Sequence, residues 1–310
     1  MIDFPASLLE WYRIHQRHLP LRGNPVPYHV LISEIMLQQT QVPRVIEKFQ
    51  EFITLFPSIQ DLAQASRADV IKAWSGLGYN RRALLLHAFA QEVIEKYNGI
   101  IPDSVELLRT LPGIGPYTAG ALASFAYNLP EPAIDVNVRR IYLRYFQGKD
   151  QGLPMGKKEE KALYELMKST LPEGKSAEFH NALMDFGSLM CTRDTPACGQ
   201  CPLRRSCHFF PLYSTGKEKS LFVMEKREEK GMVEEGKLIP NRIFRGRIVE
   251  FVRRNESKIV AVGDLGKAIK KDYTENDEIW LLGLCVKLRK EGLLNYNLDG
   301  KNVILRLAEV

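Results

Sequence analysis

The sequence predicts a mainly α-helical protein with a small C-terminal domain that combines helices and strands. Across residues 1–213, apolar side chains recur at helical spacing between turn signals, and strand-like alternation does not persist. Residues 214–240 are charged and contain few core-forming side chains, which is typical of a linker. Residues 241–310 predict three helices followed by a β-hairpin. We therefore expect two folded regions joined by a charged linker.

The first region is expected to be a series of helices with clear breaks. The stretch SLLEWYRIH, residues 7–15, places apolar residues at helical spacing. Residues 30–56 are helical with an interruption at Pro43, and residues 67–97 form two helices separated by the run GLG. Residues 105–130 predict a helix, a glycine-rich turn and a second helix. An all-α core follows from this order.

The last region predicts a winged-helix-like domain. Helices are expected at residues 243–254, 262–273 and 276–292, and apolar runs on either side of Asp299-Gly300 predict the hairpin. Cys285 is expected in the core. The apolar side of the third helix is expected to consist of Ile279, Leu282, Cys285, Val286 and Leu288.

Composition narrows the class of protein. The chain has 310 residues, of which 45% are hydrophobic, so it can bury large cores. No apolar run reaches membrane-spanning length, and the charged N-terminus lacks the apolar core of a signal peptide. We therefore expect a cytoplasmic protein. Of the net charge of +6, residues 241–310 carry +4, which permits nucleic-acid binding by a basic accessory domain without establishing it.

Four of the five cysteines lie within 17 residues, in the run MCTRDTPACGQCPLRRSC. Their spacing is C-x6-C-x2-C-x5-C, formed by Cys191, Cys198, Cys201 and Cys207. Disulfides are rare in a reducing cytosol, so we favour a metal centre. Four thiolates suit zinc or an iron–sulfur cluster, and the spacing does not choose between them.

The turn LPGIGPYTAGA, residues 111–121, is the second strong motif. Gly113 and Gly115 allow a tight turn and close approach to a partner, and Pro116 suits the first turn of a helix. The resulting helix N-terminus would expose N–H groups to a phosphate, as in a helix–hairpin–helix element that grips one DNA strand. The alternative is a plain helix–helix corner.

Two carboxylates are candidates for catalysis. Glu34 is a lone acid among apolar side chains, where a charge is costly unless it is used or solvated. Asp135 precedes the expected helix at residues 136–146. The simpler alternatives are that Glu34 lies on a wet helix edge and that Asp135 only caps its helix.

Taken in order, these motifs resemble a known family. SEIMLQQTQV, GLGY, LPGIGPYTAGA, the run DVNVRR and MDFGSLMCTRDTPACGQCPL are similar to the helix–hairpin–helix (HhH-GPD) base-excision DNA glycosylases, and most similar to their MutY adenine glycosylase branch. The resemblance covers about residues 5–212. It implies a two-lobed glycosylase core with a six-helix lobe at about 24–128, a second lobe from 1–23 plus 129–190, and a cluster loop at 191–207 that holds a [4Fe–4S] cluster.

The resemblance also implies a chemistry. Glu34 would be the general acid that protonates the departing purine, and an ionised Asp135 would stabilise the cationic sugar, in parallel with glycoside hydrolysis. Opposite protonation states need environments that separate the two pKa values. Tyr117 stands where related bifunctional enzymes carry a nucleophilic lysine, which predicts a monofunctional enzyme.

Further positions are implied to contact DNA. Gln39 matches a residue that fills the space left by the extruded base, and Tyr79 matches an aromatic that intercalates beside the opposing base. The implied DNA-binding set is Arg22, Leu37, Gln38, Gln39, Tyr79, Gly113, Gly115, Arg204 and Arg205. For the glutamines the alternative is ordinary helix surface, and for Tyr79 it is packing. The implied partner is double-stranded DNA with a mismatch or lesion, bound by a monomer near the nucleoid.

The chain also departs from the family pattern. Leu21, Asn80 and Val136 replace the usual tryptophan, second tyrosine and glycine, which bears on the choice of base. Residues 241–310 are too short for the Nudix-like domain that recognises 8-oxoguanine. In its place, Arg245, Arg247, Arg253 and Arg254 would contact DNA or form a solvated helix face. The predicted function is excision of adenine opposite guanine or 8-oxoguanine, with a thymine/uracil mismatch glycosylase and a non-catalytic DNA-binding protein as rivals.

Overall fold

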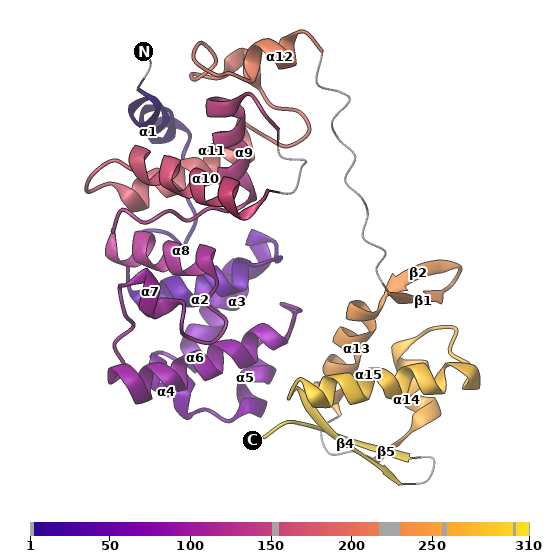
Figure 1. Cartoon of the computed structure of the whole chain (residues 1–310). Coiled ribbons are helices and arrows are strands. Elements are labelled where there is room, and N and C mark those ends of the chain that lie inside the picture. The colour runs from indigo at the N-terminus through magenta and orange to yellow at the C-terminus, as the bar shows by residue number, and fades with distance from the viewer. Residues whose placement is uncertain (1–2, 151–154, 217–229, 256–258, 300–301, 310) are drawn as a thin grey trace. The chain divides into compact units, whose positions relative to one another are not determined.

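The computed structural model describes residues 3–150, 155–216, 230–255, 259–299 and 302–309 (Figure 1). The chain divides into two compact units, Met1–Glu34 with Ile101–Glu225 and Ile35–Ile100 with Lys226–Val310. This division cuts the predicted six-helix lobe of residues 24–128, and that lobe stays a prediction. In the described part of the chain, no helix is long and apolar enough to cross a membrane.

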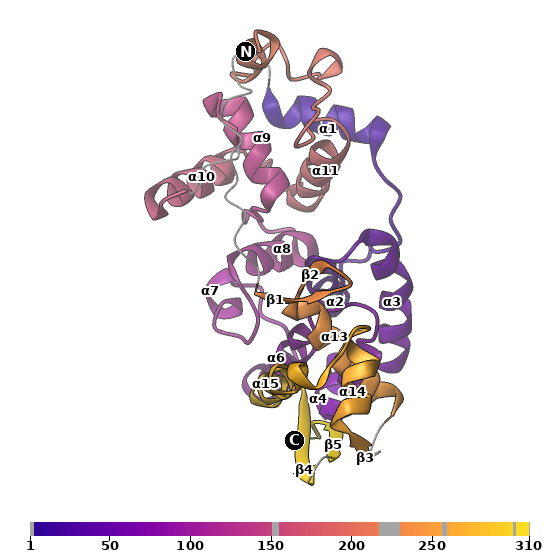
Figure 2. The ribbon, with the colours of Figure 1, turned by 90° about the vertical axis from the view of Figure 1, so that its right-hand side faces the viewer.

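Helices are the only regular secondary structure in the described residues of the first unit. Its core joins α1, α9 and α11, which lie side by side and bury aromatic side chains such as Phe4, Tyr142 and Phe186 (Figure 2). The elements are α1 (Phe4–His15), the start of α2 (Pro27–Leu37), α7 (Val105–Leu108), α8 (Pro116–Tyr127), α9 (Val136–Gln147), α10 (Lys157–Thr170), α11 (Ser176–Leu189), the short η1 (Cys198–Gln200) and α12 (Phe210–Ser214).

The second unit combines four helices of the N-terminal region with the C-terminal domain. The helical breaks expected from Pro43 and the run GLG are confirmed by α3 (Val42–Leu55), α5 (Arg67–Ala73) and α6 (Arg81–Tyr97). The additional α4 (Ile59–Gln64) begins with a capping box in which Ser58 and Asp61 bond each other's backbone N–H groups.

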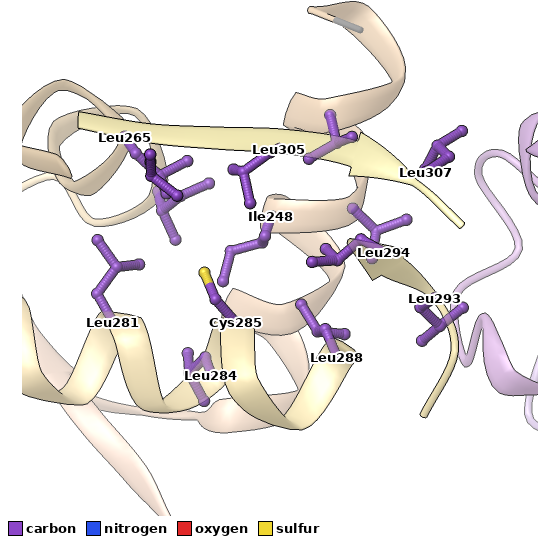
Figure 3. Close-up of a cluster of buried hydrophobic side chains, with 14 of the residues drawn as sticks. Ile248, Leu265, Leu281, Leu284, Cys285, Leu288, Leu293, Leu294, Leu305 and Leu307 are labelled. Atoms are coloured by element: carbon purple, nitrogen blue, oxygen red, sulfur yellow. The ribbon is translucent and has the colours of Figure 1, made fainter. Parts of the chain in front are cut away.

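The C-terminal domain confirms the expected three helices and hairpin. They are α13 (Asn241–Arg254), α14 (Val262–Ile269), α15 (Glu278–Lys290) and the antiparallel pair β4 (Leu294–Asp299) and β5 (Asn302–Leu307). A short β3 (Ile259–Ala261) adds to β5, and η2 (Glu275–Asp277) precedes α15. Cys285 is fully buried between α15 and α13, as expected (Figure 3).

Two expectations for this domain were wrong. Ile279, expected on the apolar side of α15, is 87% exposed, and Leu281 and Leu284 are buried instead. Residues 231–240, assigned to the linker, form a hairpin of β1 (Gly231–Glu234) and β2 (Lys237–Pro240). Its turn uses Glu235 and Gly236, both in the left-handed region, which suits a tight hairpin. Linker residues 217–229 lie outside the described residues.

Candidate active site and cysteine loop

The glycine-rich turn joins α7 to α8 and has two differently constrained glycines. Gly113 has a φ of +76°, a left-handed conformation that favours glycine. Gly115 caps α8 with an ordinary φ of −89°, and a Cβ atom built on it would meet no atom of the protein within 4 Å. Both glycines are exposed. No contact within the described residues therefore requires glycine at position 115. A partner that approaches the turn closely would require it, because a side chain there would be in the way.

Tyr117, in the first turn of α8, reaches the candidate acid. Its hydroxyl donates a hydrogen bond to Glu34 Oε2 at 2.8 Å. Burial, with the neighbouring charges of Glu34 and Asp135, raises the pKa of Tyr117 well above 10. Tyr117 is therefore a permanent hydrogen-bond donor to Glu34.

Glu34 is a half-buried acid that titrates near neutrality. Burial is the main cause that raises its pKa, to about 7, and the charge of Asp135 adds to the rise. The hydrogen bond from Tyr117 and the charge of Arg22 act in the opposite direction. Near pH 7 the carboxyl is therefore poised to give or take a proton. This contradicts the alternative that Glu34 simply lies on a wet helix edge.

Asp135 caps α9, as the simpler alternative expected. Its Oδ1 accepts hydrogen bonds from the backbone N–H groups of Asn137 and Val138, both at 2.8 Å. Its Oδ2 accepts a third from Asn137 Nδ2 at 3.0 Å. Burial raises the pKa of Asp135, and these three bonds oppose that rise by favouring the carboxylate. Capping and stabilisation of an anion are thus performed by the same contacts.

The segment before Asp135 is held by two contacts that the sequence analysis did not anticipate. A Cβ atom on Gly120 of α8 would lie 2.1 Å from the Pro132 carbonyl oxygen, so only glycine permits this approach. His180 of α11 accepts a hydrogen bond from Ala133 N–H at its Nε2, at 3.0 Å. Burial lowers the pKa of His180 to about 4, so the ring stays neutral and keeps that acceptor.

Arg22, expected near the base pocket, is bound to a buried carboxylate. Both of its terminal nitrogens donate to Asp185 of α11, at 2.9 Å each, and Arg17 donates to the same carboxylate at 2.7 Å. Asp185 is fully buried. This residue was not predicted from the sequence, although an acid within the apolar run of the last core helix is a signal of a buried ion pair.

Arg140 of α9 connects the Asp135 cap to the cysteine loop. Its Nη2 donates to Asn137 Oδ1 and to the Gly187 carbonyl, at 2.8 and 2.7 Å, and its Nε donates to the Cys191 carbonyl at 2.8 Å. A Cβ atom on Gly187 would lie 2.7 Å from the Asn137 Cβ, so glycine is needed for this packing. One guanidinium therefore orients both a neighbour of Asp135 and the first cysteine.

The four cysteines of the loop line one small cavity. Its walls are otherwise mostly apolar, with Phe186 and Leu203 among them, and Arg144 donates to the Cys191 sulfur at 3.6 Å. All four thiols are free of disulfides. Within the described residues, no three such ligands lie close enough together to hold a single metal ion. Four thiols around an apolar cavity, beside an Arg144 that is itself paired with Asp150, therefore suit a cluster of several metal atoms better than a single ion.

The two arginines that end this loop are both exposed. Arg204 donates to the Gly199 carbonyl at 2.5 Å and so also braces the loop itself. Its expected contact with a phosphate stays a prediction, as does that of Arg205.

The remaining predicted residues belong to the second unit. Gln39 and Tyr79 are exposed and have φ values of 57° and 45°, rare for residues other than glycine. Leu37 and Gln38, which directly precede Gln39, are half-buried. Arg82, which was not predicted from the sequence, holds the segment before Gln39 and the segment before Tyr79 together. It donates hydrogen bonds to carbonyl groups of both, namely those of Ile35, Met36, Gln38, Leu77 and Gly78.

The glycine-rich turn, Glu34 and Asp135 all lie in the part of the chain that matches a known family. The family described as HhH-GPD superfamily base excision DNA repair protein matches residues 32–169. The chain belongs to this superfamily and to its MutY-type branch, which confirms the resemblance seen in the sequence.

Individual relatives agree with this placement. Adenine DNA glycosylase of Mycobacterium tuberculosis (strain CDC 1551 / Oshkosh) is 43% identical over 201 residues, which cover 64% of this chain and 65% of the relative. Adenine DNA glycosylase of Buchnera aphidicola subsp. Baizongia pistaciae is 32% identical over 287 residues, which cover 85% of this chain and 81% of the relative. The solved structure of a thermostable thymine-DNA glycosylase is 30% identical with a TM-score of 0.63, covering 67% of this chain and 95% of that one.

Proposed function

We propose that this protein is a monofunctional DNA glycosylase that excises adenine paired with guanine or 8-oxoguanine. The observation that carries the proposal is the contact between Tyr117 and Glu34, which places a carboxyl with a pKa of about 7 beside the helix–hairpin–helix turn. The names of the relatives from Mycobacterium tuberculosis and Buchnera aphidicola support adenine as the base.

The proposed reaction uses the two carboxyl groups in different protonation states. Glu34, which is partly protonated near pH 7, gives its proton to the departing adenine. Asp135 acts as the carboxylate, which three N–H groups favour against the effect of burial on its pKa, and its charge stabilises the cationic sugar. Tyr117 has no amine, so water rather than a side-chain nucleophile completes the cleavage and the strand is left intact.

A panel of duplexes tests this function. We expect base release from A:8-oxoguanine and A:G duplexes and none from T:G or U:G duplexes, without strand cleavage until alkali is added. The Glu34→Gln protein should release no base from any of them. The similarity to a thymine-DNA glycosylase makes mismatched thymine the second candidate, and release from T:G alone would establish it.

The cysteine loop is proposed to hold a [4Fe–4S] cluster, as the resemblance implies. Cys191, Cys198, Cys201 and Cys207 would be its ligands, and the adjacent Arg144 would offset part of its negative charge. The cluster would fold the loop and take no part in base release. A cluster predicts about four iron atoms per chain with visible absorbance. Cys198→Ser should lower the iron content and Cys285→Ala, in the C-terminal core, should not, whereas bound zinc in place of iron would refute the cluster.

The partner implied by this function is double-stranded DNA carrying the mispair, bound by a single copy of the chain. A DNA repair role would place the protein with the nucleoid in the cytoplasm. Light scattering of the protein alone and with one equivalent of duplex tests the stoichiometry, and a second copy in the complex would contradict it.

A further inference from the structure

A large basic groove lies within the second unit, between the C-terminal domain and the segment that carries Tyr79. Its volume is about 1370 Å³, and eight arginines but only two glutamates line it. The charged residues of its walls are Arg44, Arg81, Arg82, Arg242, Arg245, Arg247, Arg253, Arg254, Glu250 and Glu291. The groove therefore has a formal charge of +6, equal to that of the whole chain.

Some of these arginines hold the groove together. Arg253 of α13 donates to the Ile71 carbonyl at 2.7 and 3.0 Å and to Asn80 Oδ1 at 2.9 Å, and its side chain is only 8% exposed. Glu250, one turn earlier, accepts from Ser75 Oγ at 3.0 Å. Asn80 occupies one of the positions where the chain departs from the family pattern. The loop of residues 75–80 is thus fixed to α13 on both sides of Tyr79.

These contacts revise the two roles expected for the arginines of α13. Arg247 binds Glu234 through both terminal nitrogens, at 2.7 and 2.9 Å, and Arg245 binds Glu291. Arg253 is structural, and Arg254, although 75% exposed, binds Glu250. The four residues therefore do not form a freely solvated face. Arg242 on α13, Arg44 on α3 and Arg81 at the start of α6 are exposed on the groove walls, and Arg44 also donates to the Gly76 carbonyl at 3.1 Å.

The groove contains two of the residues in the second unit that have left-handed backbones. Gln39 and Tyr79 both line it, and this conformation is uncommon for residues other than glycine. Tyr79 presents 44% of its surface to solvent. An exposed aromatic held in a left-handed turn, among arginines, suits a partner that offers both flat rings and anions.

We infer that this groove binds the sugar–phosphate backbone of duplex DNA next to the base pair under repair, with α13 of the C-terminal domain as one wall. The inference rests on the proposed function, because the DNA contacts expected of Gln39 and Tyr79 follow from it. Arg242 supplies phosphate contacts from α13, and Arg44 and Arg81 supply them from the opposite wall. The C-terminal domain thereby becomes part of the DNA-binding surface without a Nudix-like fold.

The experiment compares DNA affinity across a salt series for single substitutions in the full-length protein. Each phosphate contact contributes about 0.9 to the slope of log affinity against log salt. Arg242→Ala should lower that slope by about 0.9 and weaken binding roughly fivefold to tenfold near 0.1 M salt. Arg81→Ala should do the same from the other wall. Arg306→Ala removes an exposed arginine of β5 outside the groove and is the matched control.

The outcomes separate this inference from the proposed function. If Arg242→Ala and Arg81→Ala both behave like Arg306→Ala, the groove does not bind DNA and the inference is overturned. Base release from the duplex panel by the unaltered protein tests the function by itself. A protein that releases no base but still shows the Arg242 effect would refute the glycosylase and keep the groove as a DNA-binding surface.

Discussion

The Tyr117 hydroxyl lies 2.8 Å from Glu34 Oε2 and donates a hydrogen bond to it. Because its raised pKa keeps Tyr117 protonated near neutral pH, the hydroxyl remains able to donate this bond, which favours the charged form of Glu34. Burial favours the neutral form more strongly, and the balance leaves the pKa at about 7. Tyr117 therefore lowers the pH range in which the proposed general acid carries its proton.

Tyr117→Phe should move the pH dependence of base release upward. A general acid works when protonated, so the rate is expected to fall as the pH rises through about 7. Without the hydrogen bond the pKa of Glu34 rises further, and the falling limb should move by about one pH unit or more, since a bond to a charged group contributes about 1.5–3 kcal/mol. Single-turnover rates from pH 5 to 9 measure the limb.

The control for this experiment is Tyr127→Phe, on the same helix. The Tyr127 hydroxyl donates to the Ile101 carbonyl instead of to an acid. This substitution should leave the limb where it is. A limb that stays in place in Tyr117→Phe, or moves to lower pH, would show that Glu34 is not the titrating acid.

Asp135→Asn should separate catalysis from capping. Asparagine caps helices about as well as aspartate, so the free energy of unfolding should change by at most about 1 kcal/mol. The negative charge is lost, however, and base release should fall by a factor of about 100 or more. Asp135→Ala also removes the cap, and should lower stability by about 1 kcal/mol further. Base release by Asp135→Asn at the normal rate would end the catalytic assignment of Asp135.

Much of the fold was predictable because the signals are local. Pro43 restricts its own backbone, and the Asp299-Gly300 dipeptide is a sequence signal for a hairpin, so the break between α2 and α3 and the pairing of β4 with β5 could be expected from a few residues. Gly300 itself lies outside the described residues. The β1–β2 hairpin carries a similar signal at Glu235-Gly236, but the charged residues around it are typical of a linker. Local turn chemistry was the better guide there than composition.

The site was predictable only in part, because its supporting contacts join distant segments. Glu34 and Asp135 were found through motif spacing and resemblance. Asp185 binds Arg22 across 163 positions of sequence, and Arg253 binds Asn80 across 173. No periodicity or local motif encodes such a pair. The role of an arginine, as a DNA contact or as a structural brace, is therefore decided by tertiary neighbours that the sequence does not reveal.

Gly115→Ala should weaken DNA binding without harming the fold. A Cβ atom at this position meets nothing within 4 Å in the protein, and the backbone is ordinary, so stability should fall by no more than about 1 kcal/mol. A DNA strand that approaches the turn closely would collide with the added methyl group. Gly113→Ala is the contrasting variant, since its φ of +76° costs roughly 1–2 kcal/mol for alanine. Chemical denaturation measures the stability of both variants, and DNA titration measures their affinity. If Gly115→Ala binds DNA as tightly as the unaltered protein, the turn is not a DNA-binding element.

Asp185→Asn should destabilise the first unit in a pH-dependent manner. Burial alone would raise the pKa of Asp185, but the hydrogen bonds from Arg22 and Arg17 outweigh it and hold the pKa below its usual range. An acid whose pKa is lowered in the folded state contributes stability that is present above its unfolded pKa, near 4, and is lost as the pH falls through the lower folded value.

The Asp185→Asn variant leaves two arginines beside a neutral amide, so about 3–5 kcal/mol of stability should be lost at pH 7. That difference from the unaltered protein should begin to shrink below about pH 4, where Asp185 of the unfolded chain takes up a proton, and should keep shrinking as the pH falls toward the lower folded pKa. Glu160→Gln, which removes an exposed carboxylate 3.9 Å from Arg139, should cost less than about 1 kcal/mol at either pH. Denaturation curves at pH 7 and pH 3 decide the matter, and a loss for Asp185→Asn that is equally large at both would mean that its charge does not stabilise the fold.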